Sequence, residues 1–361
     1  MDGIRGTTCL VTGGSGYLGR CICSALLAAG AAEVRSLDRA PPAPDAPLPA
    51  GVRAFTGDIR SPADVAKAMT GCDLVVHCAS YGMSGRQMLE RKLTRQVNVN
   101  GTLVVLAAAS KLGVSRLVYT STYNAVFGDK PIVNADETLP LFPPSRHADE
   151  YSCTKALAER AVLQANCDAL GTCAIRPAAI YGPGEMRHFP RIARLAAAGA
   201  VCFSIGPPST RVDWVHGESV AHAHVLAAAK LVPGGAARGQ AYFISDDQPV
   251  NQTEFLRPLL TALGCRTPRI WIPVWFMLLL AYLIESICVI SWKLTGYLPH
   301  PLLLPAEVLK VGVTHYFSVA KARRELGYEP RVDPEQGMRD TVAALMAMRA
   351  RQAGSSAQKT A

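Results

Sequence analysis

Residues 8–30 read TCLVTGGSGYLGRCICSALLAAG and carry the signals of a strand, a turn and a helix in succession. The first five residues form an apolar run typical of a buried strand, and an apolar period typical of a helix follows Gly19. Between them, the glycines fit G-x-G-x-x-G, and Gly13, Gly16 and Gly19 recur every third residue. Such a turn lets the backbone approach a pyrophosphate, to which the helix presents unpaired N–H groups. We therefore predict a dinucleotide-binding loop in which Gly13, Gly16 and Gly19 contact the cofactor.

An acidic residue follows the next predicted strand at the distance that ribose recognition requires. Asp38 ends the strand pattern of residues 32–40 and lies nineteen residues after Gly19. A carboxylate there would hydrogen-bond the adenosine ribose hydroxyls and repel a 2′-phosphate, which favours NAD. Arg39 could accommodate a 2′-phosphate, so NADP stays open as the less favoured cofactor. Asp58, at the end of the third predicted strand, is expected near the adenine.

Strand and helix patterns alternate through the first half of the chain. Residues 52–60, 72–80 and 115–122 read as strands, and residues 97–113 read as a helix. Alternation of this kind predicts an α/β fold with a doubly wound, parallel, Rossmann-type sheet.

Composition and charge narrow the class of protein. The chain has 361 residues, of which 49% are hydrophobic and 18% charged, as in a globular protein with one large or two medium domains. Its net charge of +9 is scattered, which argues against a nucleic-acid partner and suits an anionic membrane surface or cofactor. The eleven cysteines include no C-x-x-C pair. They read as apolar residues in a reducing compartment, with neither a disulfide framework nor a metal site.

A group of polar side chains completes a candidate active site. Tyr151 and Lys155 are four residues apart on an alanine-rich helix pattern, so they share one helix face. Ser121 and Thr122 end the fifth predicted strand, at the sheet edge where ligands bind. A free phenol has a pKa near ~10. We expect the neighbouring Lys155 ammonium to lower that pKa, so that Tyr151 can serve as general acid and base.

The chain resembles the extended class of short-chain dehydrogenase/reductases over nearly its whole length. The motifs that carry the likeness, in order, are TGGSGYLG (12–19), GDI (57–59), HCAS (77–80), NVNGT (98–102), YTST (119–122), YSCTK (151–155), RPAAIYGPG (176–184) and RVDWVHGESVAHAH (211–224). The resemblance implies that Lys155 holds the nicotinamide ribose and that Thr122 hydrogen-bonds the substrate oxygen. Ser121 is the alternative for Thr122, because family strands commonly end in consecutive serines.

The same likeness suggests how the chain divides into domains. Residues 1–186 are expected to form the NAD-binding domain, to which residues 212–230 return. Residues 187–345 are expected to form a smaller C-terminal substrate lobe, and residues 346–361 a disordered tail.

Residues 270–292 form an apolar segment in which Glu285 is the one charged residue and Pro273 interrupts the pattern. The segment is long enough to cross a bilayer. Cations flank both ends, and a single crossing would strand the family-like segment 313–328 on the far side. We therefore favour an apolar helix or helical hairpin that dips into one leaflet beside the substrate entrance. A transmembrane helix and a helix within a soluble lobe are the alternatives.

A closer resemblance is to the 3β-hydroxysteroid dehydrogenase family, in particular its 42E branch. The carriers are the apolar segment together with YTSTYNAVFG (119–128), AYFISDDQP (241–249) and VTHYFSVAKARRELGY (313–328). The resemblance implies an NAD-dependent oxidoreductase that interconverts a secondary alcohol and a ketone on a sterol-like substrate. It also implies an endoplasmic reticulum membrane location with the cofactor domain cytosolic, and it is compatible with a homodimer. Tyr242 and Asp246 match positions that dehydrogenase/isomerases use to shift a Δ5 double bond, so isomerase activity stays open.

Two other classes of protein share these motifs. A sugar-nucleotide epimerase or dehydratase would have the same extended fold, but the apolar segment does not suit its substrate. A dehydratase would also usually place an acidic residue where Tyr123 stands. A non-catalytic NAD-binding scaffold is the second alternative, and the presence of Tyr151 and Lys155 counts against it.

Overall fold

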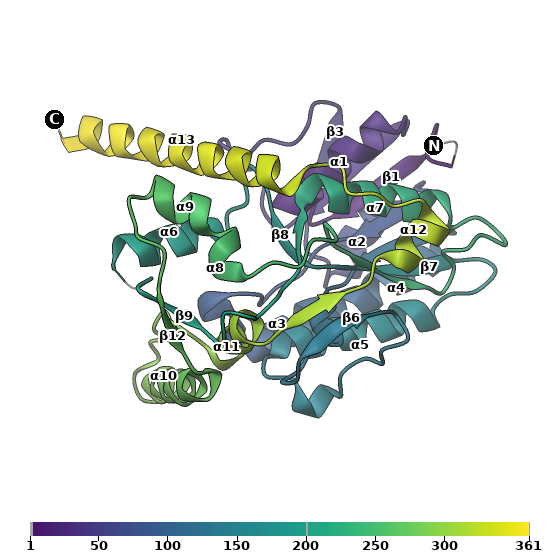
Figure 1. Ribbon diagram of the computed structural model, residues 1–361. Helices are drawn as coiled ribbons and strands as arrows, with labels where there is room; N and C mark the ends of the chain where they lie inside the picture. Colours follow the sequence, from purple (N-terminus) through teal and green to yellow (C-terminus); the bar gives the residue numbers. More distant parts are fainter. Residues whose placement is uncertain (1–2, 200, 361) are drawn as a thin grey trace.

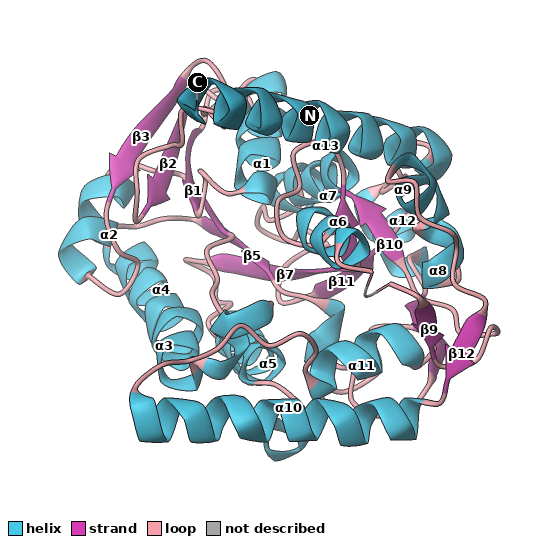
Figure 2. Cartoon of the chain, turned by 90° about the vertical axis from the view of Figure 1, so that its left-hand side faces the viewer, coloured by secondary structure: helices cyan, strands magenta, loops and turns pink. Residues whose placement is uncertain are grey.

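A seven-stranded parallel sheet forms the centre of the molecule (Figures 1 and 2) in a computed structural model that describes residues 3–199 and 201–360. The predicted Rossmann-type fold is therefore confirmed. The sheet has the order β3-β2-β1-β4-β5-β7-β11. Its strands are β1 (Thr8–Thr12), β2 (Glu33–Asp38), β3 (Val52–Thr56), β4 (Leu74–His77), β5 (Arg116–Thr120), β7 (Gly171–Pro177) and β11 (Ala241–Ile244).

Both faces of this sheet are covered by helices, which explains why its central strands are apolar throughout. Successive residues of β1 point to opposite faces, so that Cys9 and Val11 belong to one buried cluster and Leu10 to another. The first cluster includes α1 (Tyr17–Ala28) and α7 (Gly217–Ala229). The second includes α2 (Pro62–Met69), α4 (Gly101–Lys111) and α5 (Glu150–Gln164).

The strand order reverses beside β1, which pairs with β2 on one side and β4 on the other. At such a reversal the connections leave the sheet in opposite directions, so a crevice opens at the carboxyl ends of the strands. The glycine loop after β1 and the polar residues after β5 both lie at this edge.

A smaller lobe is built on short two-stranded sheets (Figure 2). The pairs are β8 (Ala179–Tyr181) with β10 (Trp214–His216), β9 (Phe203–Ile205) with β12 (Ile270–Ile272), and β6 (Ile132–Ala135) with β13 (His315–Phe317). The helices of the lobe are α6 (Phe189–Ala197), α8 (Gln252–Phe255), α9 (Arg257–Ala262) and α11 (Pro305–Gly312). The later helix α12 (Ala320–Leu326) packs against the central sheet beside β11. The predicted division was too simple, because β11 joins the central sheet although residues 187–345 were assigned to the lobe.

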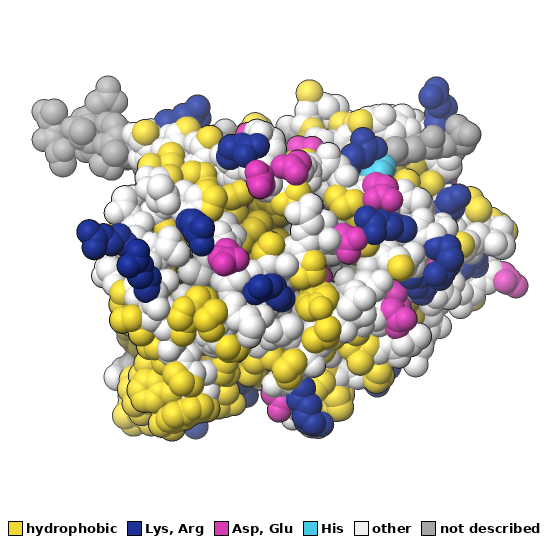
Figure 3. Space-filling view, viewed as in Figure 1, with side chains coloured by type: hydrophobic (Ala, Val, Ile, Leu, Met, Phe, Trp, Pro, Cys, Tyr) yellow, Lys and Arg dark blue, Asp and Glu magenta, His cyan; other side chains and the backbone are white. Residues whose placement is uncertain are grey.

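The apolar segment forms one continuous helix, α10 (Val274–Thr295), and not a hairpin. Pro273 stands at its N-cap, and residues 270–272 belong to β12, because proline ends a strand and suits a helix start. Helix α10 lies along one edge of the molecule, below α5 and α11 (Figure 2). Its exposed apolar side chains make the yellow patch at the lower left of Figure 3.

The chain ends in a long helix, α13 (Pro334–Thr360), which extends away from the body of the protein (Figure 1). Residues 346–360, which we expected to be disordered, continue this helix, and residue 361 lies outside the described residues. The remaining short elements are η1 (Gly85–Leu89), α3 (Arg91–Arg95), η2 (Gln96–Asn100), η3 (Tyr123–Ala125) and η4 (Pro144–Arg146).

Candidate active site

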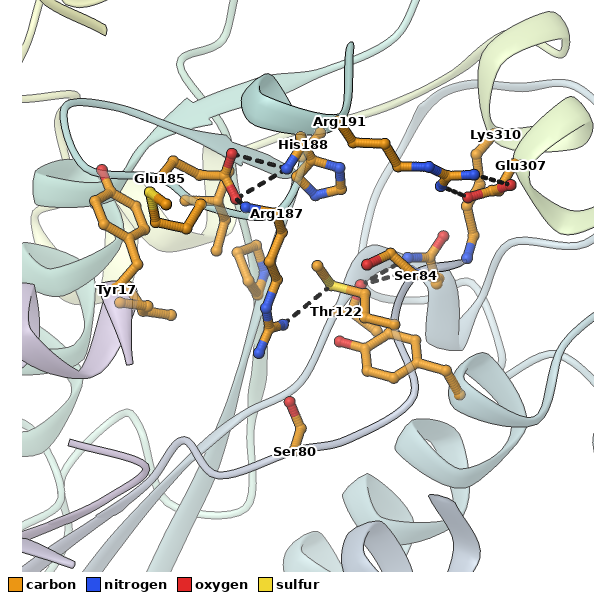
Figure 4. Close-up of a pocket in the computed structure, with 18 of the residues that line it drawn as sticks. Tyr17, Ser80, Ser84, Thr122, Glu185, Arg187, His188, Arg191, Glu307 and Lys310 are labelled. Atoms are coloured by element: carbon orange, nitrogen blue, oxygen red, sulfur yellow. Dashed lines mark hydrogen bonds and ion pairs between the residues drawn. The ribbon is translucent and has the colours of Figure 1, made fainter. Parts of the chain in front are cut away.

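One cavity of about 1040 Å³ runs from the glycine loop to the lobe (Figure 4). It contains every residue that the sequence nominated for the cofactor and the reaction. These lining residues are Gly13, Gly16, Gly19, Asp38, Asp58, Ser121, Thr122, Tyr151 and Lys155. The fold therefore brings together side chains that come from the ends of β1, β2, β3 and β5 and from α5.

The glycine loop has the geometry that an anionic ligand requires. Gly13 has a positive φ of 72°, a conformation that glycine adopts without strain. A side chain at Gly19 would place its Cβ 2.1 Å from the Gly13 carbonyl oxygen, so only glycine fits there. Helix α1 begins after Gly16 with no side-chain cap and no acidic residue in its first turn. Its free N–H groups and its dipole therefore suit the diphosphate of a dinucleotide.

Asp38 lies where the adenosine ribose is expected. Its Oδ2 accepts a hydrogen bond from the Ser15 backbone N–H at 3.2 Å, and its Oδ1 accepts one from the Arg39 N–H at 2.8 Å. Asp58 is instead paired with Arg60 at 2.6 Å. That ion pair lowers the pKa of the Asp58 carboxyl. Asp58 therefore lines the cavity as a carboxylate whose negative charge is balanced by Arg60.

Tyr151 lies in the first turn of α5, whose N-terminus is capped by Asp149. The Asp149 carboxylate accepts a hydrogen bond from the Ser152 N–H at 2.7 Å. Burial raises the pKa of Tyr151 to about 12, and the positive charge of Arg187 is the strongest influence against that rise. We predicted that Lys155 would lower this pKa, but the structure indicates a raised pKa. The loss of solvation around the buried phenol is the largest effect.

Lys155 lies on the same side of α5 but turns toward the sheet. Its ammonium donates a hydrogen bond to the Thr120 carbonyl oxygen and lies 4.1 Å from the centre of the Tyr119 ring. Burial lowers the pKa of Lys155 to about 7. Lys155 thus lines the cavity beside the end of β5, where we expect the cofactor ribose.

The two hydroxyls at the end of β5 have different partners. Ser121 donates its proton to Glu159 at 2.5 Å, and Glu159 also pairs with the buried Arg176. The Thr122 oxygen accepts hydrogen bonds from the Asn124 N–H at 3.2 Å and from the Asn124 side-chain amide at 3.0 Å. The hydroxyl of Thr122 therefore keeps its own proton available to a ligand, whereas that of Ser121 is engaged inside the protein.

Sequence reasoning missed several residues of the cavity. Ser80 lies close enough to lower the pKa of Tyr151, and Arg187 reaches into the cavity from the loop after β8. Lys310, on α11, pairs with Asp149 at 3.0 Å and lies 5.9 Å from the centre of the Tyr151 ring. Ser80 sits in the HCAS motif and could have been nominated, but nothing local in the sequence marks Arg187 or Lys310.

The far end of the cavity is largely apolar. Its wall includes Met277, Leu280 and Ile284, which come from the inner side of α10. Helix α10 thus has two roles in the architecture, since it forms part of the cavity wall and also presents an exposed apolar surface to the outside.

The two residues considered for isomerisation lie outside this cavity. Tyr242 donates a hydrogen bond to Glu325 at 2.9 Å, on the side of the sheet that α12 covers. Asp246 accepts hydrogen bonds from Tyr181 at 2.8 Å and from the His216 N–H at 3.2 Å, which makes it part of a buried network. The structure therefore gives no support to the isomerase assignment of Tyr242 and Asp246.

Comparison with known proteins decides the family. Residues 10–274 match the model of the 3-beta hydroxysteroid dehydrogenase/isomerase family. The chain belongs to this family. Short-chain dehydrogenase/reductase family 42E member 1 of Danio rerio is 47% identical over 332 residues, covering 90% of this chain and 84% of that protein. A 3-beta-hydroxysteroid dehydrogenase of Mycolicibacterium neoaurum is 39% identical over 339 residues, covering 91% and 88%.

These relatives confirm the resemblance to the 42E branch and to the 3β-hydroxysteroid dehydrogenases. As a member of this family, the protein is an NAD-dependent oxidoreductase. A dTDP-glucose 4,6-dehydratase of Streptomyces venezuelae, solved with NAD bound, superimposes with a TM-score of 0.70 over 93% of this chain and 96% of its own. Its sequence identity of 24% supports the shared fold alone.

Proposed function

We propose that this family member interconverts a secondary alcohol and a ketone on a sterol-like, lipophilic substrate, with NAD in preference to NADP. One observation carries the proposal. A single cavity joins the glycine loop and Asp38 at one end to the apolar wall of α10 at the other, and Thr122, Tyr151 and Lys155 lie between them. This order suits a dinucleotide and an apolar substrate that meet at the hydroxyl residues.

The residues divide the chemistry between them. Bound at the glycine loop, NAD would supply the acceptor for the hydride of the carbinol carbon. Tyr151 takes the substrate O–H proton in this direction and returns a proton to the ketone oxygen in the reverse direction. Thr122 donates a hydrogen bond to the same oxygen, and Lys155 holds the ribose from the β5 side. The high pKa of Tyr151 keeps the phenol protonated at neutral pH, which is the form that reduction requires.

We further propose that α10 attaches the protein to one leaflet of a membrane. The helix has 22 residues and a mean hydropathy of 2.2 over its most apolar 18, and only 17% of that window is buried. Trp275, Leu279 and Leu283 are more than half exposed. After α10, the chain returns to pair β13 with β6 and to pack α12 beside β11. An in-plane helix keeps both flanks on one side of the membrane, as these contacts require.

The proposal is tested with the full chain purified in detergent. NADH formation is measured with a panel of 3β-hydroxysterols and, separately, with a panel of sugar nucleotides. We expect turnover of hydroxysterols only. Conversion of a sugar nucleotide without sterol oxidation would favour the epimerase or dehydratase alternative, and NAD⁺ binding with no turnover of either panel would favour the scaffold.

The variant Tyr151→Phe tests the acid–base role of Tyr151 in the same assay. Removal of the phenolic hydroxyl should reduce sterol oxidation by at least about a hundredfold, which is the usual contribution of a general acid or base. The affinity for NAD⁺ should stay near that of the wild type, because the ring remains in place. Turnover at the wild-type rate would refute the acid–base role of Tyr151.

A further inference from the structure

Arg187 brings a positive charge into the cavity that no carboxylate of the described residues balances. Its guanidinium donates to the Met83 sulfur at 3.8 Å and forms no ion pair within the part of the chain that the structure describes. The cations beside it are neutralised, since Arg191 pairs with Glu307 and Lys310 pairs with Asp149. Arg187 is an exposed residue that lines the cavity, so its guanidinium is free to form charge-assisted hydrogen bonds with a bound anion.

Glu185, the acidic residue nearest to Arg187 in the sequence, uses its carboxylate to bind backbone N–H groups. The Glu185 carboxylate accepts the backbone N–H groups of Arg187 at 2.6 Å, His188 at 2.9 Å and Phe189 at 3.1 Å, and so caps the start of α6. This cap fixes the loop that leads into α6. The Arg187 side chain is thereby directed into the cavity, above Ser80 (Figure 4).

The loop that carries Arg187 lies directly against the first turn of α1. The Tyr17 hydroxyl donates a hydrogen bond to the Tyr181 carbonyl oxygen at 3.1 Å. A Cβ at Gly182 would lie 2.1 Å from that same hydroxyl, so the two segments are in close contact. The start of α1 and Arg187 both line the cavity, and the loop that leads to Arg187 is held against α1.

Arg187 lines the cavity together with Cys78 and Tyr151. Burial raises the pKa of the Cys78 thiol, and the charge of Arg187 is among the influences that oppose this rise. Cys78 lies beside the glycine loop, where its N–H donates to the Thr12 carbonyl oxygen at 3.2 Å. Arg187 also opposes the rise at Tyr151. Its charge thus acts on a group beside the glycine loop, where the diphosphate is expected, and on the reaction centre.

We propose that Arg187 binds the diphosphate of the dinucleotide from the lobe side, opposite the N-terminus of α1. The proposal rests on the proposed function in taking NAD as the ligand. A guanidinium can donate two parallel hydrogen bonds to phosphate oxygens, which supplies geometric selectivity as well as charge. Arg187 then connects the lobe to the cofactor, since it is held by α6 and contacts the ligand bound at the sheet.

The test uses the full chain in detergent and compares Arg187→Met with Arg194→Met. Arg194 is an exposed arginine of α6 that does not line the cavity, so the same chemical change there is a matched control. Dissociation constants are measured by calorimetry for NAD⁺ and ADP-ribose, which carry the diphosphate, and for adenosine, which does not. We expect Arg187→Met to weaken NAD⁺ and ADP-ribose by about tenfold to hundredfold, the usual value of a hydrogen bond to a charged group. Adenosine binding and Arg194→Met should show no change, and Arg187→Lys should fall between.

Two results would overturn the proposal. In the first, Arg187→Met binds NAD⁺ as tightly as the wild type and keeps normal turnover. In the second, NAD⁺ affinity is unchanged but kcat/KM for the sterol falls, which would assign Arg187 to an anionic group of the substrate. A wild-type protein that fails to bind NAD⁺ would instead refute the proposed function. Thermal unfolding without ligand verifies that both variants are folded.

Discussion

The carboxylate of Glu285 lies 2.9 Å from the guanidinium of Arg91, and this pair joins α10 to α3. Glu285 is the one charged residue in the apolar segment 270–292, and its side chain is only 16% exposed. The acid that seemed to interrupt the segment therefore faces the protein and is neutralised there. The outward side of α10 is left without charge until Lys293 in its last turn, as contact with lipid requires.

A charge placed on the outward side of α10 should weaken membrane attachment. Leu283 is 57% exposed and Leu279 is 66% exposed. Leu283→Glu and Leu279→Glu should each reduce binding to phosphatidylcholine vesicles by about tenfold or more, since a buried leucine side chain contributes about 1.5–3 kcal/mol. Vesicle sedimentation provides the measurement.

Glu285→Gln is the control for this experiment. It removes the one charge of the segment from a position that faces the protein, so vesicle binding should stay at the wild-type level. A large gain in vesicle binding would mean that Glu285 meets the lipid, and our placement of α10 would be wrong. Unchanged binding in the two leucine variants would mean that the attachment site lies elsewhere.

The two hydroxyls at the end of β5 should respond differently to removal. Thr122→Val should lower kcat/KM for the sterol by about a hundredfold, because one hydrogen-bond donor to the reacting oxygen is lost. Ser121→Ala should leave kcat/KM close to normal. It should lower the free energy of unfolding by about 1 kcal/mol, since the bond from Ser121 to Glu159 is lost. Steady-state kinetics and urea unfolding separate the two effects, and the reverse pattern would make Ser121 the substrate contact.

The pH dependence of the reaction should differ between its two directions. Because burial raises the pKa of Tyr151 to about 12, the phenol is protonated throughout the range from pH 6 to pH 9. Reduction needs the protonated phenol, so the titration of Tyr151 should add little pH dependence to its rate in this range. Oxidation needs the phenolate, so its rate should rise by up to about tenfold for each pH unit. An oxidation rate that is flat from pH 7 to pH 9 would show that cofactor binding lowers this pKa strongly.

Asp38 should determine the preference for NAD over NADP. Asp38→Ala removes the carboxylate that would repel a 2′-phosphate, while Arg39 stays beside the site. We expect the ratio of kcat/KM for NAD⁺ to that for NADP⁺ to fall by about tenfold or more. Both constants come from initial rates with one sterol at saturation. A ratio equal to that of the wild type would show that Asp38 does not contact the ribose.

The sequence by itself determined the first strands of the central sheet and the glycine loop. The predicted strand at residues 8–12 has the bounds of β1, and Asp38 ends β2 as expected. These features depend on local signals, because glycine, apolar alternation and helix period act over a few neighbouring residues. The position of Tyr151 and Lys155 on one face of a helix could also be predicted, because it depends on the local helix period.

Only the tertiary structure decided how charges meet in the site. Arg187 and Lys310 reach Tyr151 from separate segments, and the local pattern around each resembles that of an ordinary surface cation. The direction of the Tyr151 pKa shift was predicted wrongly, because desolvation depends on all the groups that surround the phenol. Tyr242 and Asp246 lie outside the cavity, because Tyr242 on β11 hydrogen-bonds to α12 and Asp246, after that strand, belongs to a buried network. Burial and long-range contacts are properties of the packed chain, whereas strand, turn and helix signals are properties of short stretches.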